Sequence, residues 1–170
     1  MGIERTARAP FDAPLCSPIS GEVVRLSVPS ASADAARRAC CGEWAIAAAC
    51  GVTLDRVLEV FGVRPDGMDA YELWMLLRNI GPSNLYSTTR NERWLLCWSH
   101  NLQWPPFGIV GVALPDGDGH YVVTLSGEVF DPIVAEVVSI ETWENKNFGY
   151  EMTDVLVLSK HYLARQWRWA

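Results

Sequence analysis

The first half of the chain has apolar residues at the spacing of α-helices, and these segments end at glycine or proline. Residues 44–50 are rich in alanine, which suits a close-packed buried helix. In the next segment, Leu54, Val57 and Leu58 share one helical face. A strand is expected over 21–28 and a loop over 29–36. Helices are expected over 44–50, 53–61, 69–80 and 90–103, with caps at Thr53 and Asp69 and ends at Gly51, Gly62, Gly81 and Pro105.

The second half of the chain changes to short apolar segments separated by turns, which is the pattern of β-strands. Residues 115–119 form a turn rich in glycine and aspartate, and Ser126-Gly127 is a tight turn. Because helical segments come first and strand segments later, the predicted fold class is α+β, with an N-terminal helical half followed by an antiparallel β-sheet. The expected strands are 107–114, 120–125, 128–132 and 154–159, with a single helical turn over 139–143.

Length and composition indicate one globular domain. A chain of 170 residues can form one buried core, and its 49% hydrophobic and 20% charged residues are an ordinary globular balance. Residues 1–18 hold three prolines without periodicity and are expected to be a loose lead-in. We therefore expect a single domain over 19–160, followed by an aromatic and basic tail over 161–170.

The charge and the cysteine content limit the classes of partner and ligand that we expect this protein to bind. The formal net charge of -6 leaves no basic stripe for phosphates, so nucleic acid is not an expected partner. No apolar run is long enough to cross a membrane, and the first fifteen residues lack the apolar core of a secretory signal, so we expect a cytoplasmic protein without a membrane partner. The five cysteines include no C-x-x-C pair, so we expect no disulfide framework, no metal site and no cofactor.

Cys41 is a candidate nucleophile because it lies where the alanine-rich helix should begin. The unpaired N–H groups and the macrodipole of a helix N-terminus favour a thiolate there. Gly42 would allow the backbone to approach a substrate closely, and the N–H of Cys41 would be available to stabilise an oxyanion. The alternative interpretation of Cys41 is a buried structural thiol.

A β-hairpin is expected to bring His120 beside Asp131. With Ser126-Gly127 as its two-residue turn, Val122 pairs with Asp131. His120 and Val122 share a face of the strand, so Asp131 becomes the diagonal neighbour of His120. A carboxylate–imidazole hydrogen bond would fix the ring tautomer and leave the other ring nitrogen free to deprotonate a thiol. A shift of the turn by one residue would separate the two side chains.

These pieces, in this order, resemble the papain-like cysteine peptidases, and more closely their bacteriocin-processing, double-glycine-leader branch. The resemblance implies a papain-like fold in which Cys41 is the nucleophile, His120 the general base and then acid, and Asp131 the residue that orients His120. It also implies a peptide or protein substrate, with a peptide or isopeptide bond hydrolysed through an acyl-enzyme. The resemblance spans roughly residues 40–159 and rests on Cys41-Gly42, the helices 44–51 and 53–62, His120-Tyr121-Val122-Val123 and Asp131-Pro132.

The chain departs from that family ahead of the nucleophile. The family has a glutamine a few residues before the cysteine to complete the oxyanion hole, but the glutamines here are Gln103 and Gln166. Loss of one oxyanion donor slows a reaction about 10²- to 10³-fold, unless Ser30, Ser32 or a backbone N–H replaces it. The family often has an acidic residue where Cys40 stands, so Cys40 is a second candidate nucleophile.

Other interpretations remain open from the sequence. Cys97-Trp98 together with His161 resembles viral self-cleaving leader proteases, although Cys97 falls on the apolar face of an expected helix. The same triad serves acyl transfer in acyltransferase or transglutaminase-like enzymes, and the fold also suits a binding module without strong catalysis. The tail 161–170 can pack on the domain, dock a partner or occupy the cleft after self-processing.

Overall fold

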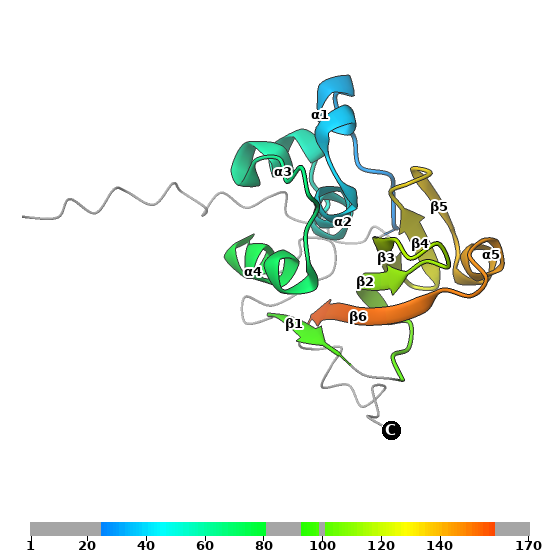
Figure 1. Ribbon diagram of the computed structural model, residues 1–170. Helices are drawn as coiled ribbons and strands as arrows, with labels where there is room; N and C mark the ends of the chain where they lie inside the picture. Colours follow the sequence, from blue (N-terminus) through cyan, green and yellow to red (C-terminus); the bar gives the residue numbers. More distant parts are fainter. Residues whose placement is uncertain (1–24, 81–92, 99–100, 159–170) are drawn as a thin grey trace, which may run out of the picture.

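The computed structural model describes residues 25–80, 93–98 and 101–158, and this part of the chain has an α+β fold (Figure 1). Within it, five helices accompany one six-stranded sheet, so the predicted fold class is confirmed. The helices are α1 (Ala33–Arg38), α2 (Cys41–Cys50), α3 (Leu54–Phe61), α4 (Ala70–Ile80) and α5 (Ile140–Lys146). The strands are β1 (Trp94–Cys97), β2 (Phe107–Ala113), β3 (Gly119–Leu125), β4 (Glu128–Asp131), β5 (Glu136–Ser139) and β6 (Glu151–Leu158).

The sheet has the strand order β1-β6-β2-β3-β4-β5, and every pair of neighbours is antiparallel. The hairpin between β3 and β4 turns at Ser126 and Gly127, which have φ values of 51° and 88°. Two successive positive φ values are typical of the type I′ turn that matches the twist of a hairpin. Leu125 pairs with Glu128 and Val123 with Phe130, so the register expected from the sequence is confirmed.

Different helices cover the two faces of the sheet (Figure 1). On one side α2 packs against β3 and β2, while α4 packs against β1; on the other side α5 packs against β4 and β5. Because successive strand residues point to opposite faces, β3 contributes Tyr121 and Val123 to the core beneath α1–α4 and Val122 to the core beneath α5. The central strands are therefore apolar on both faces.

The helix ends expected at Gly51 and Gly62 and the caps expected at Thr53 and Asp69 are present in the structure, whereas Gly81 lies outside the described residues. Gly51 ends α2 in the left-handed conformation, with φ 67°, which glycine adopts without a steric penalty. The Thr53 hydroxyl accepts a hydrogen bond from the N–H of Arg56 at 3.2 Å, and a carboxylate oxygen of Asp69 accepts one from the N–H of Glu72 at 2.7 Å. These side chains satisfy backbone donors in the first turns of α3 and α4.

The helix expected over 90–103 is wrong, because the described residues 93–98 contain strand β1. Leu96 packs on the side of α1–α4, as does Trp94, whereas Leu95 and Cys97 pack on the side of α5. A short apolar run that is buried on both faces carries no alternation, so its spacing cannot be distinguished from that of a helix.

The structure also differs from the sequence pattern in four smaller features. Helix α1 begins at Ala33 inside the expected loop 29–36, with the Ser32 hydroxyl accepting a hydrogen bond from the N–H of Ala35 at 3.2 Å. Residues 25–30 form no strand, and 21–24 lie outside the described residues. Strand β5 was not expected, and the single turn expected at 139–143 is the start of α5.

Among the described residues, none of the helices has the length and apolar character needed to cross a membrane. The expected lead-in, 1–18, and the expected tail, 161–170, both lie outside the described residues.

Candidate active site

Cys41 is the first residue of α2, and the short segment after α1 delivers it there. Cys40, at the N-cap, has an extended backbone with φ -93° and ψ 177°. The first N–H groups of a helix lack partners within the helix, so the Cys41 side chain lies at the positive end of the α2 dipole. Cys41 is half-buried, unlike Cys50 at the other end of the same helix, which is fully buried.

The buried carboxylate of Glu43 holds the start of α2 in place. One of its oxygens accepts a hydrogen bond from the N–H of Cys40 at 2.6 Å, and the other accepts one from the N–H of Arg64 at 2.9 Å. Glu43 has no exposed surface, so its negative charge is stabilised by these backbone donors rather than by water. The contact ties Cys40 to the connection between α3 and α4.

Gly42 packs closely against the side chain of Met68. A Cβ at this position would lie 3.2 Å from Sδ and 3.4 Å from Cβ of Met68, which is a tight contact. This contact belongs to the same connection between α3 and α4 that Glu43 holds. Gly42 therefore lets α2 pack closely against this connection.

The surroundings of Cys41 favour the thiolate. A hydrogen bond from the Cys40 thiol, together with His120 and the backbone N–H of Tyr121, outweighs burial and lowers the pKa of Cys41 to about 4. The same bond to Cys41, with burial and the charge of Glu43, raises the pKa of Cys40. Cys40 is thus the neutral donor of the pair and Cys41 the anion, which argues against Cys40 as the nucleophile.

His120 and Asp131 form a buried hydrogen bond across the β3–β4 hairpin. His120 Nε2 lies 2.8 Å from Asp131 Oδ1, and the two residues are 4% and 5% exposed. His120 is the second residue of β3, a central strand, and Asp131 is the last residue of β4. The diagonal neighbours expected from the hairpin register are therefore in contact.

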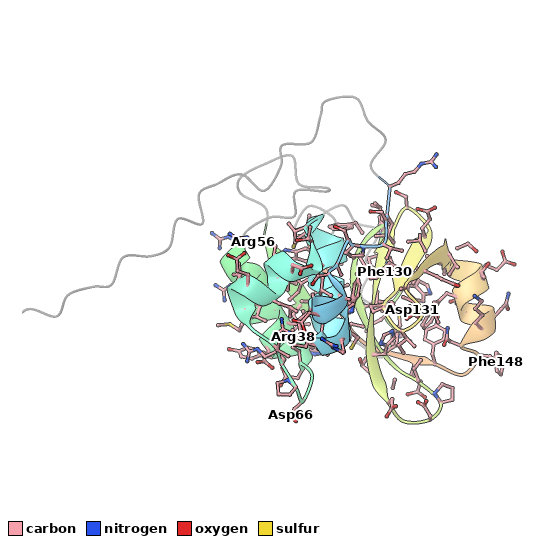
Figure 2. The ribbon with its side chains drawn as sticks, turned by 90° about the horizontal axis from the view of Figure 1, so that it is seen from above. Arg38, Arg56, Asp66, Phe130, Asp131 and Phe148 are labelled. Atoms are coloured by element: carbon pink, nitrogen blue, oxygen red, sulfur yellow. The ribbon has the colours of Figure 1, made fainter. Side chains whose placement is uncertain are left out.

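Asp131 is held by two further donors. Its Oδ1 also accepts the N–H of Ile133 at 2.9 Å, and its Oδ2 accepts the indole N–H of Trp143 at 2.7 Å. Trp143 is a buried residue of α5, and in Figure 2 Asp131 lies between the layer of α1–α4 and α5. Burial alone would raise the pKa of Asp131, but the hydrogen bonds from His120 and Trp143 lower it overall. Asp131 is therefore a carboxylate.

The indole of Trp143 is itself fixed by an aromatic cluster, which we define as Trp104, Trp143 and Tyr150. The Trp143 ring meets the other two edge-on, with centroids 5.5 Å from Trp104 and 5.0 Å from Tyr150. Glu144 accepts hydrogen bonds from the Trp104 indole at 2.8 Å and from the Tyr150 hydroxyl at 2.6 Å. Edge-on rings and shared acceptors leave Trp143 little freedom to turn away from Asp131.

The hydrogen bond to Asp131 determines which nitrogen of the His120 ring carries a proton and which can act on Cys41. Since a carboxylate only accepts, Nε2 carries the proton of the 2.8 Å bond, and Nδ1 is the nitrogen that can serve Cys41. Burial would lower the pKa of His120, but Asp131 and Cys41 raise it to about 9. Because the pKa of Cys41 is about 4 and that of His120 is about 9, the resting pair is a thiolate beside an imidazolium at neutral pH.

The structure brings Cys41, His120 and Asp131 together and leaves the other candidates apart. Cys97 is buried in β1, and burial raises its pKa, while His161 lies outside the described residues. The Ser32 hydroxyl donates its hydrogen bond to Asp55 Oδ1 at 2.5 Å, so it does not replace the missing glutamine as an oxyanion donor. Over 25–80, 93–98 and 101–158, no group of three or more His, Cys, Asp or Glu residues is placed to hold a metal ion.

Sequence reasoning missed two residues that support the triad. Glu43 stands three positions after Cys40, which is the spacing of a capping box, so that signal was available even though a cysteine replaces the usual serine or threonine. Trp143 gave no such signal. Its contact with Asp131 depends on how α5 folds back over β4, which local periodicity does not encode.

Neither a scan against models of known protein families nor a search of curated proteins finds a match for this chain.

Proposed function

We propose that this protein is a papain-like cysteine hydrolase that cleaves a peptide or isopeptide bond through an acyl-enzyme on Cys41. The observation that supports this most is the 2.8 Å hydrogen bond between the buried His120 and Asp131, with His120 close enough to Cys41 to lower the pKa of its thiol. The site contains the three groups of a nucleophilic triad: a thiolate, a base that can carry its proton, and a buried carboxylate that orients the base.

The fold supports the proposal in a second way. Cys41 stands at the N-terminus of a helix that packs against β3, and His120 and Asp131 come from β3 and β4 of the antiparallel sheet. A helical layer that carries the thiol, facing a sheet that carries the imidazole and the carboxylate, is the arrangement that the resemblance to papain-like peptidases implies.

Acylation follows from this arrangement. The Cys41 thiolate attacks the carbonyl carbon of the scissile bond, a C–S bond forms, and the carbonyl electrons move to oxygen as an oxyanion. When the oxyanion collapses, the C–N bond breaks and the leaving amine takes the proton from Nδ1 of His120. A thioester and a neutral imidazole remain, with the ring still held by Asp131.

Deacylation uses the same groups in reverse. Nδ1 of His120 removes a proton from water, and the water oxygen attacks the thioester carbon. The C–S bond then breaks, the carboxylic acid product leaves, and the thiolate–imidazolium pair is restored. The N–H of Cys41, at the first position of α2, is available as an oxyanion donor in both steps. An amine in place of water would give acyl transfer from the same intermediate.

An activated ester tests the proposal without knowledge of the natural substrate. We expect p-nitrophenyl acetate to transfer one acetyl group to Cys41, with a burst of nitrophenolate followed by slower turnover, because deacylation follows acylation. Intact-protein mass spectrometry and peptide mapping would locate the acetyl group. In His120→Ala we expect the acetyl group to persist, because the base for deacylation is missing.

Cys97→Ala is the matched control, because it removes a cysteine outside the triad. This variant should keep the burst, whereas Cys41→Ala should lose both the burst and the acetyl group. Equal nitrophenolate release by wild type and Cys41→Ala, or acetylation of Cys97 in place of Cys41, would contradict the proposal.

A further inference from the structure

Asp154 is a buried carboxylate with one unpaired oxygen. The residue is 6% exposed, and its Oδ1 has no hydrogen-bond partner among the described residues. Its Oδ2 accepts the hydroxyl of the neighbouring Thr153 at 2.8 Å. A buried carboxylate that lacks a partner costs free energy, and native proteins keep few of them. The unpaired oxygen therefore calls for a functional explanation.

A β-bulge and a glycine direct this carboxylate. In the pairing of β2 with β6, Gly111 pairs with Asp154 and Val112 with Met152, so Thr153 is an extra residue on β6. Such bulges commonly re-aim a side chain beside an active site. A Cβ at Gly111 would lie 2.7 Å from both Cγ and Oδ1 of Asp154, and closer still to Oδ2. The carboxylate thus occupies the space that the glycine leaves open.

The same register places Asp154 across Gly111 from Tyr121, the residue that follows His120. Gly111 pairs with Tyr121 on its other side, so Tyr121 and Asp154 flank the glycine on the face of the sheet that α1–α4 cover. Tyr121 lies in β3, and its backbone N–H is among the groups that lower the pKa of Cys41. Burial raises the pKa of the Tyr121 phenol, and the nearby charges of Asp154 and Cys41 raise it further.

A second carboxylate adds negative charge at this place. Burial is the main reason that the pKa of Asp154 is raised, and the charge of Asp69 contributes in the same direction. Asp69 is exposed at the start of α4, so it lies nearer to solvent than Asp154. No described basic side chain forms an ion pair with either carboxylate.

We propose that Asp154, with the Tyr121 hydroxyl and Asp69, binds a cationic group of the substrate, such as a lysine or arginine side chain close to the scissile bond. This inference rests on the proposed function, because it gives the substrate class of the same site. A cation would supply the donor that Oδ1 lacks, and the Tyr121 oxygen can accept a second hydrogen bond. Asp69 would attract the cation from solvent toward the buried carboxylate.

Matched pairs of peptidyl fluoromethyl ketones test the inference. In one pair, lysine or its neutral analogue norleucine stands beside the ketone; in a second pair, the same exchange is made one residue further away. We expect Cys41 to be alkylated about 10- to 100-fold faster by the lysine member of at least one pair, as a charge-assisted hydrogen bond predicts. Equal rates within both pairs for the wild-type protein would overturn the inference without any variant.

Asp154→Asn keeps the shape of the side chain and should abolish the preference for lysine. Asp66→Asn is the matched control, because Asp66 is exposed at the tip of the connection between α3 and α4 (Figure 2). It should keep the preference. An undiminished lysine preference in Asp154→Asn would overturn the inference.

Iodoacetamide separates this inference from the proposed function, because the reagent has no side chain to recognise. The lysine preference of each variant is therefore expressed relative to the iodoacetamide rate of that same variant, so that a change in the general reactivity of Cys41 is divided out. Reaction with iodoacetamide but no lysine preference would end the inference alone. Failure of every reagent to alkylate Cys41 would end the proposed function and the inference together.

Discussion

The imidazole of His120 and the carboxylate of Asp131 are joined through Nε2 and Oδ1 at 2.8 Å, in a position almost closed to solvent. In Asp131→Asn the charge that stabilises the protonated ring is lost, so we predict that the pKa of His120 falls from about 9 toward 6.5. Acyl-enzyme turnover should fall by about 10²- to 10⁴-fold, because an amide no longer fixes the ring tautomer. NMR titration of the ring protons and ester hydrolysis measure the two effects.

The pair formed by His120 and Asp131 also makes the stability of the folded protein depend on pH. The folded-state pKa of His120 lies above its ordinary value of 6.5, so the folded protein binds this proton more tightly than the unfolded chain. The contribution to stability is complete below about pH 6.5 and is lost as the pH rises through about 9. An unchanged His120 pKa in Asp131→Asn would contradict this account of the pair.

Trp143→Phe should loosen Asp131 while keeping the aromatic packing. The change removes the indole donor from Oδ2, so we predict a loss of about 1–3 kcal/mol in the free energy of unfolding near neutral pH. Asp131 has a lowered pKa, so the stability that it contributes is present above its ordinary value of 3.8 and is lost as the pH falls through the folded-state pKa. The difference between variant and wild type should therefore shrink in acid, as measured by urea unfolding.

Trp104→Phe is the control for this change, because its indole donates to the half-buried Glu144 and Tyr150 instead of to Asp131. We expect Trp143→Phe to lower the pKa of His120, because Asp131 is held less firmly, and Trp104→Phe to leave it unchanged. If both tryptophan variants shift that pKa equally, the aromatic cluster acts through packing and Trp143 has no separate positioning role.

Much of the triad was predictable because it depends on local rules. The turn at Ser126-Gly127 fixed the hairpin register, and that register alone brings Asp131 beside His120. Cys41 was identified from the alanine-rich helix that follows it. In both cases the periodicity of one segment or one hairpin was sufficient.

The rest depends on contacts between distant segments. The apolar run Trp94–Cys97 by itself predicts part of a helix, because burial on both faces removes the strand alternation. The support of Asp131 by Trp143 needs α5 to fold over β4, and the unpaired oxygen of Asp154 needs a bulge at Thr153. Tertiary packing determines these features, and no short pattern along the chain encodes it.

Glu43→Gln should weaken the start of α2. An amide can accept from only one of the two backbone N–H groups that Glu43 now satisfies, and its NH₂ would face the other donor. We predict a loss of about 1–3 kcal/mol in the free energy of unfolding, measured with urea. Glu59→Gln, which breaks an exposed pair with Arg56, should change it far less. Equal effects of the two changes would contradict a bracing role for Glu43.

Cys40 should lower the pKa of Cys41 without itself acting as the nucleophile. Its thiol makes the largest contribution to the low pKa of Cys41, so Cys40→Ala should raise that pKa above 4. Cys40→Ser keeps a donor and should raise it less. The measurement is the pH at which the rate of Cys41 alkylation falls on the acid side. If that pH is the same in Cys40→Ala and wild type, the hydrogen bond between the two thiols has no role.

The most direct test of the central claim is the pH dependence of Cys41 alkylation by iodoacetamide, followed by peptide mapping in wild type and His120→Ala. We predict that the wild-type rate is nearly constant between pH 5 and 8, because Cys41 is already a thiolate in this range. The rate should fall as the pH approaches about 4, where the thiolate is protonated. In His120→Ala the constant range should shrink from the acid side, since the imidazolium partner is gone. A wild-type rate that rises about tenfold per pH unit from 5 to 8, as for an ordinary thiol, would contradict the account.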